Sequence, residues 1–126
     1  MGASSESESD SQHVLALRRL MDTLARRAHE RPPGSYTTKL LDGGLEKIAG
    51  KIREEAEELI EAGGEADTAE GRAHFVYEAA DLLFHTMVLL AWRGVDIDDV
   101  AKELERREGT SGLVEKANRA KKESTE

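Results

Sequence analysis

The chain contains no cysteine among its 126 residues. Disulfides, thiol catalysis and zinc–thiolate sites are therefore excluded. Aromatic residues make up only 4% of the chain, and the formal net charge is −8. The lack of excess positive charge argues against a nucleic-acid-binding protein, which normally carries a basic face. The remaining composition, 35% charged and 38% hydrophobic, is typical of one soluble helical domain with a modest core.

Long hydrophobic runs and a signal peptide are also missing. The longest apolar stretch, residues 82–92, is interrupted by His85 and Thr86 and is too short to span a bilayer. The first residues carry neither the basic region nor the apolar region of a signal peptide. We therefore expect a cytoplasmic, soluble protein without a membrane partner.

The hydrophobic periodicity predicts an all-α fold, a bundle of four to five helices, because no segment of useful length alternates with the period of a strand. Residues 1–11 are mostly Ser, Glu and Asp, so we expect a disordered acidic tail there. The domain is predicted to span residues 12–119, followed by a C-terminal tail over residues 120–126. A first helix should carry its apolar stripe from Val14 to Ala28, because the prolines and glycine at residues 32–34 cannot continue it.

Three further helices are expected. The second runs from about residue 38 or 44 to residue 62, and the third covers residues 68–93. From residue 79 to residue 92 the third helix is apolar almost all round, which marks a buried helix or one shared with a partner subunit. A fourth helix should begin after the N-cap Asp96 and direct Ile97, Val100 and Leu104 inward. Residues 113–122 form either a short basic helix or a tail.

Five carboxylates in two short clusters are the strongest functional signal: Glu54, Glu55, Glu58, Glu78 and Asp81. Each cluster lies in a predicted helix, where residues three and four apart are neighbours on one face. Packing the two helices together would gather negative charges that repel one another. Mg²⁺ is held by carboxylates together with substrate phosphates, so the pattern predicts Mg²⁺-dependent phosphate chemistry.

The first cluster has a plain alternative, since acids on helices usually form a solvated face. With Ile52 at the centre of the apolar face, Glu54 points away from the core, as this alternative requires. Glu55 and Glu58 instead fall about 60° and 120° from the centre, at the edge of the apolar stripe. The first cluster alone leaves the two interpretations open.

The second cluster is more specific. Glu78 and Asp81 lie among apolar neighbours, and a buried carboxylate is normally paired or bound to a metal. The alternative is a buried ion pair, but no Lys or Arg occurs between Arg72 and Arg93. That gap favours a metal site. His85, four residues after Asp81, is interpreted as orienting the Asp81 carboxylate or as a core histidine rather than as a ligand.

Basic residues precede the acids along the chain. Lys39, Lys47 and Lys51 lie on the second predicted helix or at its start. Each lysine taken singly is most simply a solvated side chain. Beside a carboxylate–metal cluster, however, basic groups can bind the outer oxygens of a polyphosphate.

These motifs resemble a known family. The Glu-x-x-Glu and Glu-x-x-Asp pattern is similar to that of the all-α nucleotide pyrophosphatases (MazG-like). Within that superfamily the chain resembles the phosphoribosyl-ATP pyrophosphatases of histidine biosynthesis. The resemblance covers about residues 14–119 and rests on four segments: residues 32–40, 44–56, 78–85 and 111–117. Arg53 departs from the family, which commonly has glycine before Glu-Glu-Ala.

The resemblance implies a function and a site. It implies Mg²⁺-dependent hydrolysis of phosphoribosyl-ATP to phosphoribosyl-AMP and pyrophosphate, and a homodimer with helices paired across the two subunits. The metal ligands would then be Glu55, Glu58, Glu78 and Asp81, with Glu54 at a second metal or at the attacking water. The substrate contacts would be Ser35, Tyr36, Lys39, Lys47 and Lys51.

Two alternatives stay open at this point. A house-cleaning nucleoside triphosphate pyrophosphatase would share the metal acids, and only residues 32–40 and the closing segment at 111–117 speak against it. A non-catalytic helical interaction module would carry the same acids as a merely solvated face.

Overall fold

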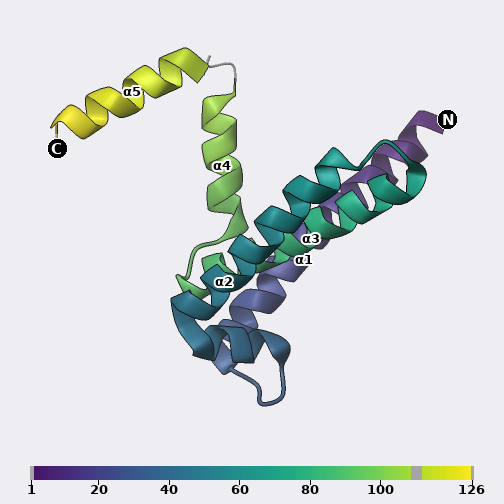
Figure 1. Ribbon diagram of the computed structural model, residues 1–126, viewed down its shortest axis with the longest axis vertical. Helices are drawn as coiled ribbons and strands as arrows, with labels where there is room; N and C mark the ends of the chain where they lie inside the picture. Colours follow the sequence, from purple (N-terminus) through teal and green to yellow (C-terminus); the bar gives the residue numbers. More distant parts are fainter. Residues whose placement is uncertain (1, 109–111, 126) are drawn as a thin grey trace.

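The computed structural model describes the backbone of residues 2–108 and 112–125, with side chains for residues 12–108 and 116–122. Its elements are α1 (Gly2–Glu30), α2 (Tyr36–Gly64), α3 (Ala69–Trp92), α4 (Ile97–Arg107) and α5 (Gly112–Thr125). All elements of the described ranges are helices, so the all-α prediction is confirmed. The helices α1, α2 and α3 lie side by side, whereas α4 and α5 project away from them (Figure 1).

The first and last helices extend beyond their predicted limits. Helix α1 begins at Gly2, inside the segment expected to be a disordered tail, because an established helix gains one hydrogen bond for each residue added. Helix α5 crosses the predicted boundary at residue 120 and supports the helical alternative for residues 113–122. Ser111, which opens the closing segment of the resemblance, lies outside the described residues. The predicted domain limits stay predictions.

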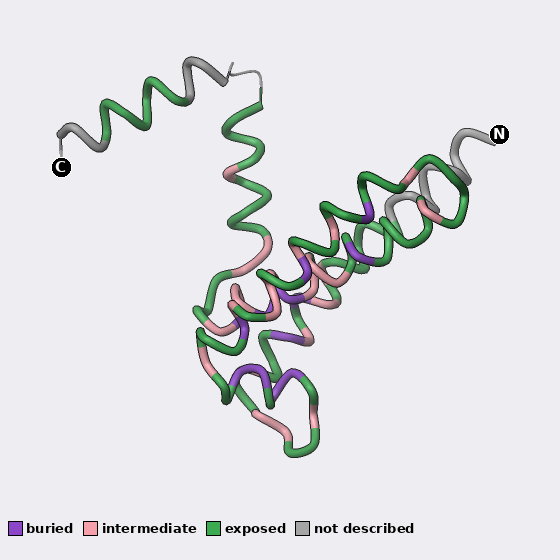
Figure 2. The backbone as a smooth tube through the Cα atoms, viewed as in Figure 1, coloured by how far each residue is buried: buried purple, intermediate pink, exposed green. Residues whose placement is uncertain are grey.

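The core lies where the first three helices meet. Its buried side chains come from all three: Met21, Leu24, Leu40, Leu41, Ile48, Met87, Val88 and Ala91. Figure 2 shows the buried residues confined to this three-helix part, whereas α4 is exposed or half-buried. The contact between α2 and α3 is the most extensive in the chain, so these two helices form a firm support for groups placed between them.

Helix α2 is bent at Gly44. This residue has φ 71° and ψ −164°, a left-handed conformation that costs glycine little and other residues more. The bend explains why the sequence suggested two starting points for this helix, at residue 38 and at residue 44. The first segment buries Leu40 and Leu41 in the core and carries Tyr36 at its start.

Side chains cap the later helices, and the N-cap predicted at Asp96 is confirmed. The Thr68 hydroxyl accepts a hydrogen bond from the Gly71 N–H at 3.0 Å at the start of α3. Asp96 and Asp99 form a reciprocal capping box at the start of α4. Arg18 of α1 donates a hydrogen bond to Asp96 Oδ2 at 2.6 Å. This ion pair connects the start of α4 to the three-helix bundle.

The Arg18–Asp96 pair makes a pH-dependent contribution to stability. Hydrogen bonds from Arg18 lower the pKa of Asp96 to about 2. A carboxyl group whose pKa is lower in the folded state stabilises the fold at pH values above its unfolded-state pKa. This stabilisation is lost as the pH falls through the folded-state pKa. We therefore expect the urea midpoint of wild type to exceed that of Asp96→Asn by a constant amount above about pH 5. This difference should shrink as the pH falls toward 2.

The control for this prediction is Asp22→Asn. Asp22 also pairs with Arg18 at 2.6 Å, but it lies four residues away on the exposed side of the same helix. Ion pairs in such positions contribute little to the stability of the fold. Its urea midpoint should stay near that of wild type at every pH. A gap between wild type and Asp96→Asn that widens in acid would contradict the assignment.

The prediction that α4 turns its apolar residues inward is confirmed for Ile97 and wrong for Val100 and Leu104. Ile97 is partly buried against the core, whereas the side chains of Val100 and Leu104 are exposed. The reason is geometric, since α4 leaves the bundle directly after the Gly94 turn (Figure 1). The apolar stripe was recognised correctly, but within residues 12–108 and 116–122 nothing buries its outer part.

Helix α3 is the most apolar element of the chain. With 24 residues, it is long and apolar enough to cross a membrane by length and composition alone. Core helices of soluble proteins meet the same measures, and Met87 and Val88 of α3 are fully buried here. Its first half is different, because Phe75, Val76 and Tyr77 are exposed in the single chain.

Candidate active site

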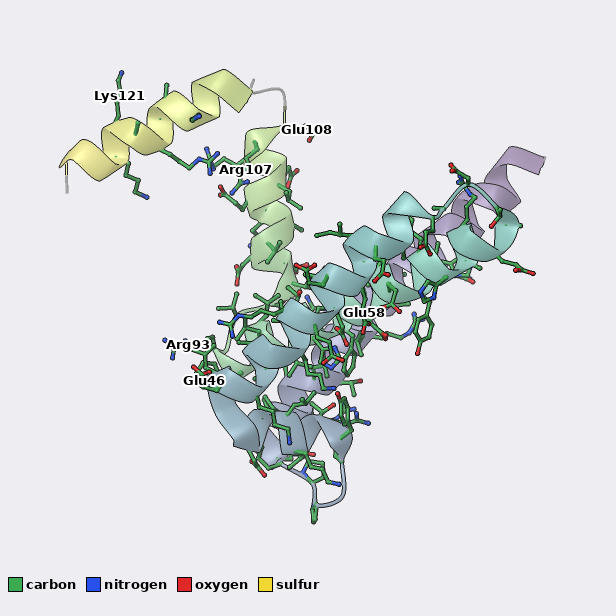
Figure 3. The ribbon with its side chains drawn as sticks, viewed as in Figure 1. Glu46, Glu58, Arg93, Arg107, Glu108 and Lys121 are labelled. Carbon is green, nitrogen blue, oxygen red and sulfur yellow. The ribbon has the colours of Figure 1, made fainter. Side chains whose placement is uncertain are left out.

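The packing of α2 against α3 buries two of the predicted acids. Only 7% of Glu55 and 5% of Glu78 are exposed; the apolar surroundings of Glu78 predicted its burial, whereas the position of Glu55 had left two interpretations open. Asp81 is half-buried, whereas Glu54 and Glu58 are exposed. Figure 3 places Glu58 midway along the paired helices. The structure therefore groups Glu55, Glu58, Glu78 and Asp81 and leaves Glu54 at the solvent side.

Glu55 is held by a histidine. Its Oε2 lies 2.7 Å from His85 Nδ1, and the other ring nitrogen of His85 lies 3.0 Å from the Tyr36 hydroxyl. The interpretation that His85 orients the Asp81 carboxylate is wrong, because His85 contacts the backbone carbonyl of Asp81 at 3.0 Å. The carboxylate that His85 contacts is that of Glu55, on the neighbouring helix.

Glu78 is buried without a matching cation. Its Oε2 has no hydrogen-bond partner, and its Oε1 lies 3.7 Å from His74 Nε2, beyond hydrogen-bonding distance. A buried carboxylate left in this state is costly, unless a cation or a proton accompanies it. The chemistry of Glu78 therefore fits a bound cation, because His74 is its only ion-pair neighbour among residues 12–108 and 116–122 and no Lys or Arg of these ranges pairs with it.

The carboxylates perturb one another. The proximity of the Glu78 carboxyl group, together with partial desolvation and the nearby charges of Glu54 and Asp81, raises the pKa of Glu58. Burial raises the pKa of Glu55, the charge of His85 opposes this rise, and the charges of Asp81 and Glu58 add to it. Carboxyl groups that raise one another's pKa lie close together, so one cation could bind to several of them.

A polar cleft opens beside these acids. It has a volume of about 330 Å³ and is lined by Glu58, Glu61, Ala62, Glu65, His74 and Glu78. Among residues 12–108 and 116–122, no three Asp, Glu or His side chains are placed so that they alone could hold a metal ion. This arrangement suits a hard cation that takes the remainder of its oxygen ligands from water and from a phosphate substrate.

The predicted substrate contacts lie in three different settings. Ser35 caps α2, with its hydroxyl 3.4 Å from the Thr38 N–H, so a structural role accounts for it. Lys51 Nζ lies 3.9 Å from Glu54 Oε2, which brings one lysine to the acidic part of α2. Lys39 and Lys47 are exposed and are available to a ligand that approaches this face.

Sequence reasoning missed two features of the site. His74 lies four residues before Glu78 on α3, and that helical spacing was a signal that could have found it. The bond between Tyr36 and His85 joins residues 49 positions apart, and no local pattern carries that information.

A sequence model described as "Phosphoribosyl-ATP pyrophosphohydrolase" matches residues 17–108. The matched range includes the whole acid cluster, Tyr36 and His85. The chain belongs to the phosphoribosyl-ATP pyrophosphohydrolase family. The resemblance inferred from residues 32–40 and 78–85 is thereby confirmed.

Similar proteins support this membership. A phosphoribosyl-ATP pyrophosphatase of Rhodopirellula baltica is 68% identical over 112 residues, which cover 88% of this chain and 92% of that protein. Proteins of the same name from Dechloromonas aromatica and Rhodobacter capsulatus are 46% and 50% identical over 106 residues, covering 84% of this chain and 94% and 99% of their own lengths. The chain thus spans nearly the full length of these members of the phosphoribosyl-ATP pyrophosphohydrolase family.

Proposed function

We propose that the chain hydrolyses phosphoribosyl-ATP to phosphoribosyl-AMP and pyrophosphate in histidine biosynthesis. Membership of the phosphoribosyl-ATP pyrophosphohydrolase family names the substrate and the bond that is cut. The observation that carries the proposal is the pair of buried acids, Glu55 and Glu78, on facing helices. Such a pair is costly to the fold without a cation, and a triphosphate substrate brings cations with it.

The proposed cofactor is Mg²⁺, held by Glu55, Glu58, Glu78 and Asp81. Two observations support this set: the unpartnered Oε2 of Glu78 and the raised pKa of Glu58 beside it. When bound, the ion would offset charge on the phosphate oxygens and make a bound water more acidic. The protein's own contribution is to present oxygens on two rigid helices, so that little reorganisation accompanies the reaction.

The remaining residues would bind the rest of the substrate. Lys39, Lys47 and Lys51 supply positive charge for phosphate oxygens that the metal does not reach. Ser35 and Tyr36 lie before and at the start of α2, where the backbone N–H groups of a first helical turn favour an anion. Glu54 faces solvent, so we assign it to the attacking water or to a second ion.

The direct test is pyrophosphate release with Mg²⁺ from phosphoribosyl-ATP, run beside ATP, dUTP and dITP. We expect release from phosphoribosyl-ATP alone, because residues 32–40 distinguish this family from other nucleotide pyrophosphatases. Release only from the other triphosphates would move the chain to the house-cleaning class while preserving the acid site. No release from any of them would favour a non-catalytic interaction module.

We propose that two copies of the chain pair through the first half of α3. Val76 and Leu83 of α3 are seven residues apart and therefore lie on one face of the helix, where they are 67% and 39% exposed. Ile60 of α2 and Tyr77 of α3 are also exposed, at 70% and 62%. Exposed apolar side chains that gather on one face mark an interface. Glu78 follows two residues after Val76 on α3, so a partner helix on this face would border the site.

This pairing is tested by sedimentation at micromolar concentration. Wild type should sediment as a dimer, and Val76→Asp should sediment as a monomer, because a charge buried in an apolar interface is strongly disfavoured. Val95→Asp is the matched control, since Val95 is exposed but lies beyond the far end of α3. A monomeric wild type would exclude the pairing.

We also place the protein in the cytoplasm, without membrane or nucleic-acid partners. A net charge of −8 disfavours binding to polyanions, and the proposed substrate is a small soluble nucleotide.

A further inference from the structure

A chain of hydrogen bonds runs from the surface to a buried acid of the site. The hydroxyl of Tyr36, at the start of α2, lies 3.0 Å from His85 Nε2. The opposite nitrogen of the same ring, Nδ1, lies 2.7 Å from Glu55 Oε2. The Tyr36 side chain is half exposed, whereas His85 is 5% and Glu55 is 7% exposed. Three residues from separate turns of two helices thus form one connected unit.

The acceptors around His85 determine where its proton lies. Nδ1 faces the Glu55 carboxylate and also the backbone carbonyl of Asp81 at 3.0 Å. Because both groups are acceptors, Nδ1 must carry the hydrogen. In the neutral ring Nε2 is then an acceptor, and the Tyr36 hydroxyl donates to it. The ring also stacks edge-on against Phe84, with centroids 5.1 Å apart, so its orientation is fixed on several sides.

This arrangement occupies one oxygen of Glu55 and leaves the other oxygen to a ligand. We propose that Tyr36 and His85 are positioning residues, which hold Glu55 through Oε2 so that its other oxygen is ready for the divalent cation. Hydrogen bonds to a ligating carboxylate typically set its orientation and change metal affinity about 10–100-fold. The inference rests on the proposed function, and it gives Tyr36 a role that differs from direct contact with the substrate.

Three substitutions separate the links of the chain. His85→Asn places an amide N–H near the position of Nδ1 and keeps the bond to Glu55. His85→Gln reaches the position of Nε2 and loses the bond to Glu55. Tyr36→Phe removes only the hydroxyl from a half-exposed side chain. The matched control is Thr86→Val, which removes a hydroxyl that donates to the backbone of its own helix at Leu82 O, 2.8 Å away.

The decisive measurement is Mg²⁺ binding by titration calorimetry without substrate. We expect the dissociation constant to rise roughly tenfold or more in His85→Gln and by a smaller factor in Tyr36→Phe. His85→Asn should stay closer to wild type than His85→Gln, and Thr86→Val should match wild type. A residue that only contacts substrate would change KM at saturating Mg²⁺ and leave this constant unchanged.

The outcomes distinguish this inference from the proposed function. If wild type binds Mg²⁺ and His85→Gln and Tyr36→Phe bind it equally well, the positioning role is overturned and the metal site remains. If wild type binds no Mg²⁺ even with a non-hydrolysed triphosphate present, the proposed metal site itself fails. If His85→Gln does not fold, Tyr36→Phe decides, because its ring and its exposed surface are retained.

Discussion

Glu78→Gln is expected to reduce pyrophosphate release by more than about 100-fold, since even residues that only orient metal ligands change activity by 10–100-fold. The glutamine has nearly the shape of the glutamate but brings no charge to the cation. Asp81→Asn should have an effect in the same direction. The measurement is the initial rate of pyrophosphate release at saturating substrate and Mg²⁺.

The fold should survive this substitution. Glu78 is buried with an unpartnered oxygen, and a neutral amide is less costly to bury than an uncompensated carboxylate. The helical circular dichroism of Glu78→Gln should therefore equal that of wild type, and its melting temperature without Mg²⁺ should be equal or higher. Loss of activity together with loss of helix would contradict this explanation.

Glu57→Gln provides the matched control. Glu57 is an exposed acid of α2, one residue before Glu58, and it lines no part of the cleft. The substitution removes the same charge from the same helix, so it corrects for any change in the general field of the protein. Its rate should stay within about twofold of wild type, because solvent screens exposed charges strongly. Normal activity in Glu78→Gln would exclude the metal-site assignment.

The second large effect is stabilisation of the substrate-free protein by Mg²⁺. A ligand that binds only the folded state stabilises it by about 2.7 kcal/mol at one hundred times its dissociation constant. For a chain of this length, that corresponds to a rise on the order of 10 °C in melting temperature. The cation should gain this energy by removing repulsion among Glu55, Glu58, Glu78 and Asp81, two of which have a raised pKa.

Thermal unfolding measured at constant ionic strength, with NaCl replacing MgCl₂, separates specific binding from screening. The rise should vanish in Glu78→Gln and Asp81→Asn and persist in Glu57→Gln. A wild type whose melting temperature ignores Mg²⁺ would remove the metal from the proposed function. Together with an absence of turnover, it would support the non-catalytic alternative.

The helices were predictable because their signals are local. The stripe that contains Met21 and Leu24 and the cap at Asp96 each depend on residues a few positions apart, whereas α2 runs to Gly64, two residues beyond its predicted end. The burial of Glu78 was predictable for the same reason, since its neighbours on α3 are apolar, whereas the position of Glu55 at the edge of an apolar stripe left its burial open. The exposed side chains of Val100 and Leu104 show the limit of this reasoning, because the apolar stripe of a helix does not indicate which surface the helix packs against.

The sequence by itself determined an all-helical chain, the identity of its acids and a resemblance that the family match confirmed. The tertiary structure alone decided which partner each group meets. His85 contacts the carboxylate of Glu55, 30 positions away, and only the backbone of Asp81 in its own helix, and Tyr36 reaches His85 from the start of α2. Such contacts depend on the geometry with which two helices pack. Those geometries arise from the whole core, whereas the periodicity of one helix constrains only that helix.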